Sequence, residues 1–149
     1  MTTKKKSLQP SKNARFPLWI VFLALALVAG TALLLLNNSP AATRALPLEI
    51  SVAQAAQLRE QGAFVLDVRQ PEEWNELHVP GATLIPLDQL ASRVNEVPKD
   101  KEVVVICRSG NRSQAGRDIL LQAGFEKVTS VSGGIIAWRN AGYPTVSGP

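Results

Sequence analysis

A short run of β-branched residues that leads directly into a polar loop and then a helix constrains this chain most strongly. Residues 103–106 are Val-Val-Val-Ile, and a continuous apolar run of this kind predicts a strand buried on both faces of a sheet. The loop that follows holds the only cysteine, Cys107, and runs into a helical pattern that ends at Gly124. A strand, a tight loop and a helix in this order favour an α/β domain.

Apolar runs and helical patterns alternate through the rest of the chain. We expect strands at 48–50, 64–69, 82–85, 103–106 and 128–131, and helices that begin after Ser51, at Pro71, at Leu87, in the cysteine loop and after Ser132-Gly133-Gly134. The alternation predicts an α/β fold with a central, mainly parallel sheet flanked by helices. In such sheets ligands bind beyond the carboxyl ends of the strands, which is where the cysteine loop lies.

An uncharged and almost entirely apolar run spans residues 18–36. Its length matches the roughly 20 residues that a helix needs to cross a bilayer, and Trp19 lies where an interfacial aromatic residue belongs. We therefore expect a basic cytoplasmic tail at 1–17, a transmembrane signal anchor at 18–36, a linker at 37–46 and a folded domain at 47–149. Because the flanking positive charges precede the apolar run, the positive-inside rule places the domain outside the cytoplasm, in the periplasm or its equivalent.

A cleavable signal peptide is the alternative interpretation of the same run. Ser39-Pro40-Ala41 and Thr43-Arg44-Ala45 are weak candidates for a cleavage site. The apolar run is longer than the roughly 7–15 residues of a typical signal peptide, which favours the anchor. Either interpretation exports the domain.

The positive charge of the chain is concentrated at its N-terminus. Five of its 16 basic residues lie in the first 15 positions, namely Lys4, Lys5, Lys6, Lys12 and Arg15. The remaining eleven are balanced by 12 acidic residues, so the domain is close to neutral. We therefore expect no nucleic-acid partner.

Cys107 lies in a setting that favours a reactive thiolate. It precedes a helix N-terminus, Arg108 and Arg112 add positive charge, and Gly110 permits a backbone conformation in which amides of the loop point at the sulfur. The thiolate is the nucleophilic form of the side chain. The alternative is a buried cysteine that only packs, since free cysteines are among the most buried residues. An exported chain with a single cysteine has no partner for an internal disulfide.

Four segments, in order along the chain, resemble the rhodanese family of sulfurtransferases. They are residues 66–74 (LDVRQPEEW), 77–82 (LHVPGA), 107–113 (CRSGNRS) and 131–134 (VSGG), the last followed by Trp138. The resemblance covers about residues 47–145. Leu77 departs from the family pattern, which usually has glycine at this position, and the departure bears only on the local turn.

The resemblance implies a transfer of sulfane sulfur through a persulfide on Cys107. The thiolate would take sulfur from thiosulfate or a similar donor and pass it to cyanide or a thiol. The active-site loop would comprise Arg108, Ser109, Gly110, Asn111, Arg112 and Ser113, with its amides around the persulfide and the two arginines attracting the donor anion. No cofactor or metal is expected.

Two other functions share these residues. One is a rhodanese-like module without enzymatic turnover, which binds a partner or senses persulfide. The other is a phosphatase or arsenate reductase. Four residues separate Cys107 from Arg112, whereas the loop that this arrangement resembles in tyrosine phosphatases has five. The shorter loop makes a smaller pocket and favours sulfur chemistry.

Asp67 and Arg69 end a predicted strand on the site edge, and we expect them to form a salt bridge that props the loop. His78, the only histidine, is expected to be a hydrogen-bonded structural residue rather than a general base.

The remaining polar and aromatic neighbours are given structural roles. The acidic residues Glu72, Glu73 and Glu76 are expected to form a solvated helix face, with favourable charge near the helix N-terminus. Trp74 and Trp138 are expected to pack in the core or at its rim.

Overall fold

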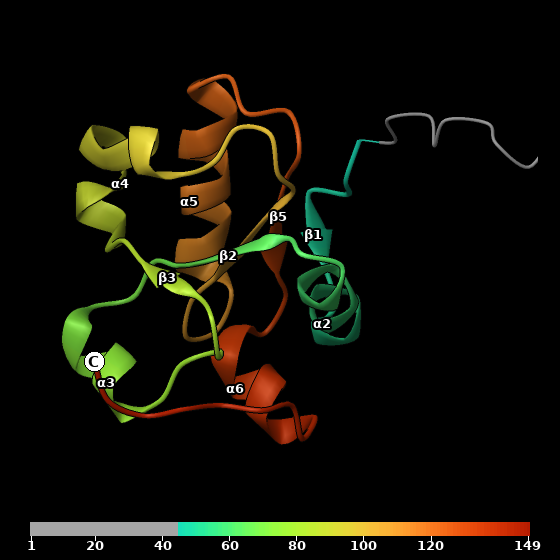
Figure 1. The fold of residues 1–149 in the computed structure, drawn as a ribbon, viewed down its shortest axis with the longest axis vertical. Coiled ribbons are helices and arrows are strands. Elements are labelled where there is room, and N and C mark those ends of the chain that lie inside the picture. The colour runs from blue at the N-terminus through green and yellow to red at the C-terminus, as the bar shows by residue number, and fades with distance from the viewer. Residues whose placement is uncertain (1–44) are drawn as a thin grey trace, which may run out of the picture. The chain divides into compact units, whose positions relative to one another are not determined.

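A computed structural model describes residues 45–149 of the chain (Figure 1). The predicted cytoplasmic tail, the transmembrane anchor and most of the linker lie outside the described residues. Within residues 45–149, no helix is both long enough and apolar enough to span a membrane.

Five parallel strands form one sheet, as the alternating pattern predicts. They are β1 (Glu49–Ile50), β2 (Phe64–Asp67), β3 (Thr83–Leu84), β4 (Val103–Ile106) and β5 (Val128–Val131), in the spatial order β1-β5-β4-β2-β3. The expected strand at 64–69 ends at Asp67, because the chain turns there and the Asp67 carboxylate accepts a hydrogen bond from the Arg69 amide at 3.0 Å. The expected strand at 82–85 is reduced to two residues at the sheet edge.

The connecting segments are helical. They are α2 (Val52–Glu60), α3 (Pro71–Glu76), α4 (Leu87–Arg93) with the short 3₁₀ helix η1 (Val94–Glu96), α5 (Asn111–Gln122) and α6 (Gly134–Asn140). Ser51 caps α2 as expected, through a reciprocal pair of hydrogen bonds with Gln54.

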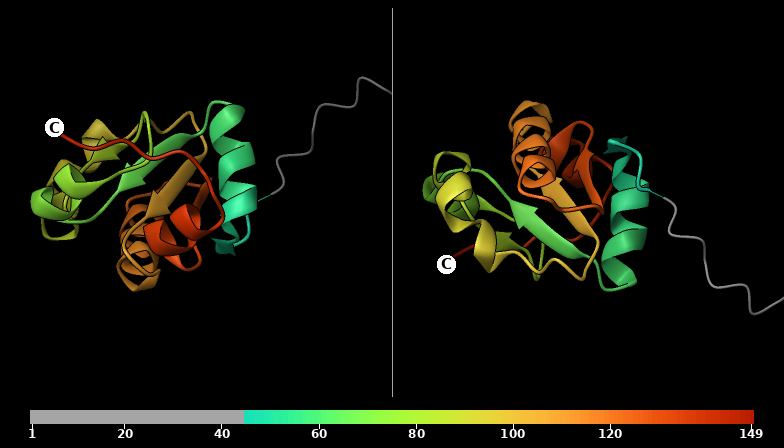
Figure 2. Two further views of the ribbon diagram at one scale, coloured as in Figure 1. Left: turned by 90° about the horizontal axis from the view of Figure 1, so that it is seen from below. Right: turned by 90° about the horizontal axis from the view of Figure 1, so that it is seen from above.

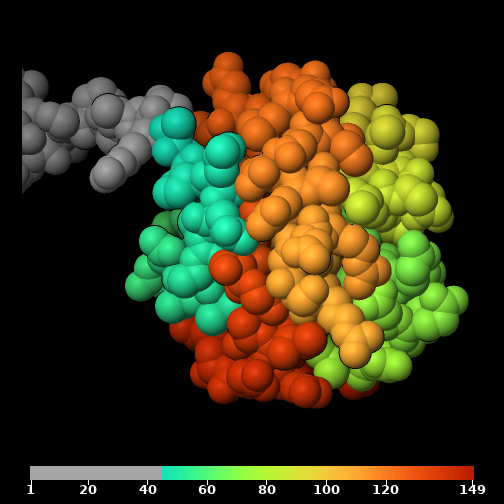
Figure 3. Space-filling view, turned by 180° about the vertical axis from the view of Figure 1, so that it is seen from behind, coloured from blue at the N-terminus to red at the C-terminus, as the bar shows by residue number. Residues whose placement is uncertain are grey.

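The sheet separates two apolar clusters, because successive side chains of β4 point to opposite faces. Val103 and Val105 pack with Leu90 of α4 and Leu120 of α5, whereas Val104 and Ile106 pack in the cluster on the opposite face. That opposite cluster includes Ala55 and Ala56 of α2 and Ile135 and Trp138 of α6. Figure 2 shows the helices on both sides of the sheet, and in Figure 3 α5 forms the central orange band of the face seen from behind.

The topology gathers the predicted site at one edge. Asp67 ends β2, Cys107 follows β4 and the Gly133-Gly134 pair follows β5. These strands are parallel neighbours, so their carboxyl ends meet at the same edge of the sheet. Three of the four segments that resemble the rhodanese family therefore lie at the same ends of the strands.

A substitution at Leu66 tests how strongly the stability of the fold depends on its apolar core. Its side chain is 0 % exposed, whereas the side chain of Leu48 is 59 % exposed. We expect Leu66→Ala to lower the free energy of unfolding by about 2–5 kcal/mol, because the deletion leaves a cavity that the strands cannot close. Leu48→Ala, the same deletion at an exposed position, should change it by no more than about 0.5 kcal/mol in urea unfolding. Equal losses in the two variants would contradict the described packing.

Candidate active site

The loop that carries Cys107 is held through its backbone by the start of α6. The Ile135 amide donates to the Cys107 carbonyl at 2.8 Å, and the Ile136 amide donates to the Arg108 carbonyl at 3.2 Å. Gly134 lies against the same peptide, so closely that a Cβ atom there would come within 2.6 Å of the Arg108 carbonyl carbon. Gly134 also has φ +55°, so only glycine meets both the space and the backbone requirement.

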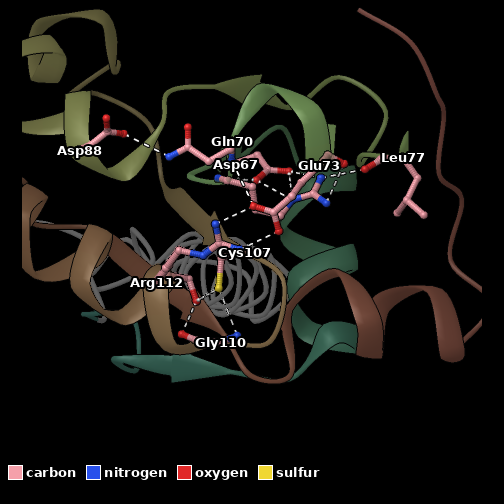
Figure 4. Close-up of polar contacts among 10 residues, drawn as sticks. Asp67, Gln70, Glu73, Leu77, Asp88, Cys107, Gly110 and Arg112 are labelled. Carbon is pink, nitrogen blue, oxygen red and sulfur yellow. Dashed lines mark hydrogen bonds and ion pairs between the residues drawn. The ribbon is translucent and has the colours of Figure 1, made fainter. Parts of the chain in front are cut away.

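The sulfur of Cys107 is fully buried and has two polar neighbours. The Gly110 amide donates to Sγ at 3.1 Å, and the thiol faces the Ser113 hydroxyl oxygen at 3.7 Å (Figure 4). Ser113 in turn donates to the Gly110 carbonyl at 2.6 Å, which closes the loop on itself. Gly110 has φ +114°, a backbone conformation that favours glycine, as the sequence predicted. One backbone amide donates a hydrogen bond to the sulfur, whereas the sequence predicted that several amides would do so.

Arg112 turns its guanidinium toward α3. Its two terminal nitrogens donate to both carboxylate oxygens of Glu73, at 2.6 and 2.7 Å (Figure 4). These hydrogen bonds lower the pKa of Glu73 to about 2, against the opposing effect of burial. They also raise the pKa of Arg112, an effect that burial opposes and that the negative charges of Glu73, a Cys107 thiolate and Asp67 reinforce.

The expectation of a solvated acidic helix face is therefore wrong for Glu73. Glu72 and Glu76 are exposed, but the Glu73 side chain is only 23 % exposed because it is drawn onto Arg112. Its position in the first turn of α3 has the favourable dipole placement that was expected. The sequence does not show that it is also the partner of a loop arginine.

Asp67 and Arg69 form the expected salt bridge. Both are buried, and the Arg69 guanidinium donates to the Asp67 carboxylate at 2.7 Å. The remaining Arg69 donors bond the carbonyl oxygens of Glu73 at 3.1 Å and Leu77 at 2.7 Å. The bridge thus braces α3 and the turn after it, and it supports the cysteine loop only through Glu73 and Arg112.

His78 is structural in this fold. Its ring is stacked on Trp74 at 3.6 Å between centroids, and its Nδ1 lies 3.1 Å from the Trp74 carbonyl oxygen. Its backbone pairs with Val146 near the C-terminus. Trp138 is buried and donates from Nε1 to the Pro144 carbonyl at 2.9 Å. These positions agree with the packing roles expected for the three residues.

The outer residues of the loop face solvent. Arg108, Ser109 and Asn111 are exposed, and Arg108 lines a groove of about 200 Å³ between the loop, α3 and α6. Cys107 is not among the residues that line this groove. Within residues 45–149, no three His, Cys, Asp or Glu side chains form a group that could hold a metal ion. That the protein needs neither metal nor cofactor stays a prediction.

Comparison with known proteins gives the same result at three levels. A family model described as a rhodanese-like domain matches residues 51–141. A sulfurtransferase of Allochromatium vinosum is 38% identical over 87 residues, which span 58% of this chain and 81% of that protein. The thiosulfate sulfurtransferase GlpE of Pseudomonas syringae is 41% identical over 97 residues, 64% of this chain and 91% of its own.

Solved structures agree. A rhodanese-related protein from Thermoplasma volcanium superposes with a TM-score of 0.63 at 34% identity, over 67% of this chain and 98% of that one. The rhodanese-like domain of an Anabaena protein also gives a TM-score of 0.63, at 26% identity, over 68% of this chain and 80% of its own.

The Glu73–Arg112 ion pair should stabilise the folded domain to an extent that depends on pH. We expect Glu73→Gln to lower the free energy of unfolding by about 1 kcal/mol at pH 7, because the pair is only partly withdrawn from water. The pKa of Glu73 is lowered on folding, so its contribution is complete above the ordinary value of 4.5 and is lost as the pH falls toward about 2. The difference between wild type and Glu73→Gln should therefore shrink below pH 4.5.

Urea unfolding at pH 7 and pH 3 measures this difference. Glu72→Gln is the matched control, since Glu72 lies one residue away on the same helix and is exposed. A loss in Glu72→Gln as large as that in Glu73→Gln would contradict the special role of the pair.

Proposed function

The chain belongs to the family of rhodanese-like domains, and from that membership we propose that it is a sulfurtransferase that carries sulfur on Cys107. The observation that carries the proposal is the position of this thiol. It lies past the carboxyl end of the central strand β4, in a closed loop whose Gly110 amide hydrogen bonds to the sulfur. The thiolate is the nucleophilic form of a cysteine side chain, and the Gly110 amide is placed to donate a hydrogen bond to it.

In the first step the Cys107 thiolate attacks the outer sulfur of thiosulfate or a similar donor. A bond forms between Sγ and that sulfur, the sulfur–sulfur bond of thiosulfate breaks, and its electron pair leaves with sulfite. The enzyme is left with a Cys107 persulfide. No general base is assigned to this step, which agrees with the structural role of His78.

In the second step a nucleophile takes the outer sulfur. Cyanide or a thiolate attacks it, the bond to Sγ breaks, and its electron pair returns to Cys107 as the thiolate. Attack, transfer and release restore the starting enzyme without an external oxidant or reductant.

The two loop arginines contribute unequally to this proposal. Arg112 shares its charge with Glu73, whereas the exposed Arg108 takes part in no ion pair among the described residues. We assign attraction of the donor anion mainly to Arg108, and we assign to Arg112 the shaping of the loop. Because Cys107 is fully buried, its surroundings must move before a donor reaches Sγ.

Replacement of the nucleophile tests the proposal directly. We expect residues 45–149 to convert thiosulfate and cyanide into thiocyanate, and Cys107→Ser to lose on the order of a thousandfold or more of this activity. The double variant Cys107→Ser, Ser92→Cys is the control, since it moves the only thiol to an exposed position on α4. It should be as inactive as Cys107→Ser.

Full activity in Cys107→Ser would overturn the proposal. Mass spectrometry after thiosulfate treatment should show a gain of one sulfur that cyanide removes. A gain that no acceptor removes would favour the persulfide-sensing module instead, and hydrolysis of a phosphate ester by Cys107 without sulfur gain would favour a phosphatase.

We also propose that residues 18–36 anchor the protein in a membrane, with the catalytic domain on the outer side. Support comes from the sequence alone, namely the length of the apolar run and the positive charges before it. We expect the full chain to remain in the membrane fraction after alkaline carbonate extraction, with an intact mass that includes residues 1–41. A soluble product that lacks these residues would show instead that the segment is a cleaved signal peptide.

A further inference from the structure

The groove beside the cysteine loop combines an apolar floor with charges of opposite sign. Its apolar lining comes from Leu77, Ile135 and Ile136, and the Ile136 side chain is 40 % exposed, which is unusual for a large apolar residue of this domain. Arg108 and Arg139 contribute two guanidinium groups.

The charge balance of the groove is positive. Arg69 and Glu73 also line it, but their charges are matched by Asp67 and Arg112. Glu76 adds one carboxylate that forms no ion pair in the described part of the chain, and neither does Arg108 or Arg139. Two arginines and one glutamate that form no ion pair in the described part of the chain therefore line the groove.

Two residues that line the groove are linked to Cys107 through the backbone. Arg108 directly follows Cys107, and the Ile135 amide is bonded to the Cys107 carbonyl oxygen. The thiol itself does not line the groove, so a molecule bound there lies beside the loop rather than on the sulfur. A persulfide extends the reacting atom beyond Sγ by one sulfur–sulfur bond, about 2 Å.

We propose that this groove binds the sulfur acceptor, and that the acceptor is a small thiol that carries a carboxylate. The proposal rests on the proposed function and names the substrate class of its second step. Arg108 and Arg139 bind the carboxylate, and the hydrocarbon part of the thiol packs on Leu77 and Ile136. A carboxylate gains charge-assisted hydrogen bonds there, whereas a neutral thiol gains only the apolar contact.

The sulfur transfer needs no atom or electron from outside the Cys107 persulfide and the acceptor. The acceptor thiolate attacks the outer sulfur of the Cys107 persulfide, a new sulfur–sulfur bond forms in the acceptor, and the bond to Sγ breaks. The electron pair of that bond stays on Sγ as the thiolate, and the proton of the persulfide, where present, leaves with the transferred sulfur.

Matched acceptors test the charge preference. Enzyme loaded with thiosulfate and freed of excess donor is mixed with mercaptopropionate or with mercaptopropanol, and the rates are compared at equal thiolate concentration. We expect the second-order rate constant for discharge of the persulfide to be about five- to tenfold higher with mercaptopropionate. The preference should fall as salt is added, because exposed charges are screened.

Variants assign the preference to the groove. Arg139→Gln should abolish most of the difference between the two thiols, and Arg139→Lys should restore part of it. Lys101→Gln removes the same charge from an exposed residue two positions before β4, at the amino ends of the strands, and should leave the preference unchanged. Equal rates for the two thiols with wild-type protein would overturn the proposal, as would an equal loss in Lys101→Gln.

A binding measurement separates this proposal from the proposed function. The Cys107→Ser protein is titrated with the unreactive thioether methylthiopropionate and with its alcohol analogue, and backbone amide shifts are followed by NMR, which also reports whether the variant is folded. We expect shifts at Ile136 and Arg139 that saturate at a lower concentration of the carboxylate than of the alcohol analogue. Their absence would overturn the groove assignment even if the persulfide forms, whereas their presence without persulfide formation would overturn the proposed function alone.

Discussion

The contact between two stretches of backbone, residues 107–108 and residues 134–136, sets the shape of the cysteine loop. Two amides of α6 bond the carbonyl oxygens of Cys107 and Arg108, and no side chain intervenes because Gly134 has none. Backbone contacts of this kind leave little freedom to either partner. The loop is therefore joined to α6 by backbone hydrogen bonds, and residues of both line the groove.

A series of ion pairs and hydrogen bonds holds the other side of the cysteine loop. Asp67 holds Arg69, Arg69 binds the carbonyl oxygens of Glu73 and Leu77, and the Glu73 carboxylate binds Arg112. Asp67 ends β2, Glu73 lies in α3 and Arg112 lies in α5, so these contacts join three elements. The loop arginine that sequence alone would give to the substrate is therefore committed to the protein, and the exposed Arg108 and Arg139 are left to face solvent.

What can be predicted from the sequence depends on how far apart the interacting residues lie along the chain. Local patterns predict the α2 cap and the places of the strands, although β2 and β3 are shorter than expected, because these features depend mainly on neighbouring residues. Glu73 and Arg112 are 39 residues apart, and the position of Glu73 near a helix N-terminus already has a sufficient local explanation. The groove has no local pattern at all, because its lining residues come from α3, the cysteine loop and α6. The number of amides at the sulfur depends on dihedral angles within the loop, which residue types restrict but do not determine.

The dependence of the loop on α6 has a consequence for the order in which the protein is made. Cys107 is synthesised 28 residues before Ile135, so the thiol exists for a time without the backbone partners that shape its loop. The pairing of β1 with β5 likewise waits for the later strand. Until α6 docks, Cys107 lacks both the backbone partners that shape its loop and the complete burial that it has in the finished fold.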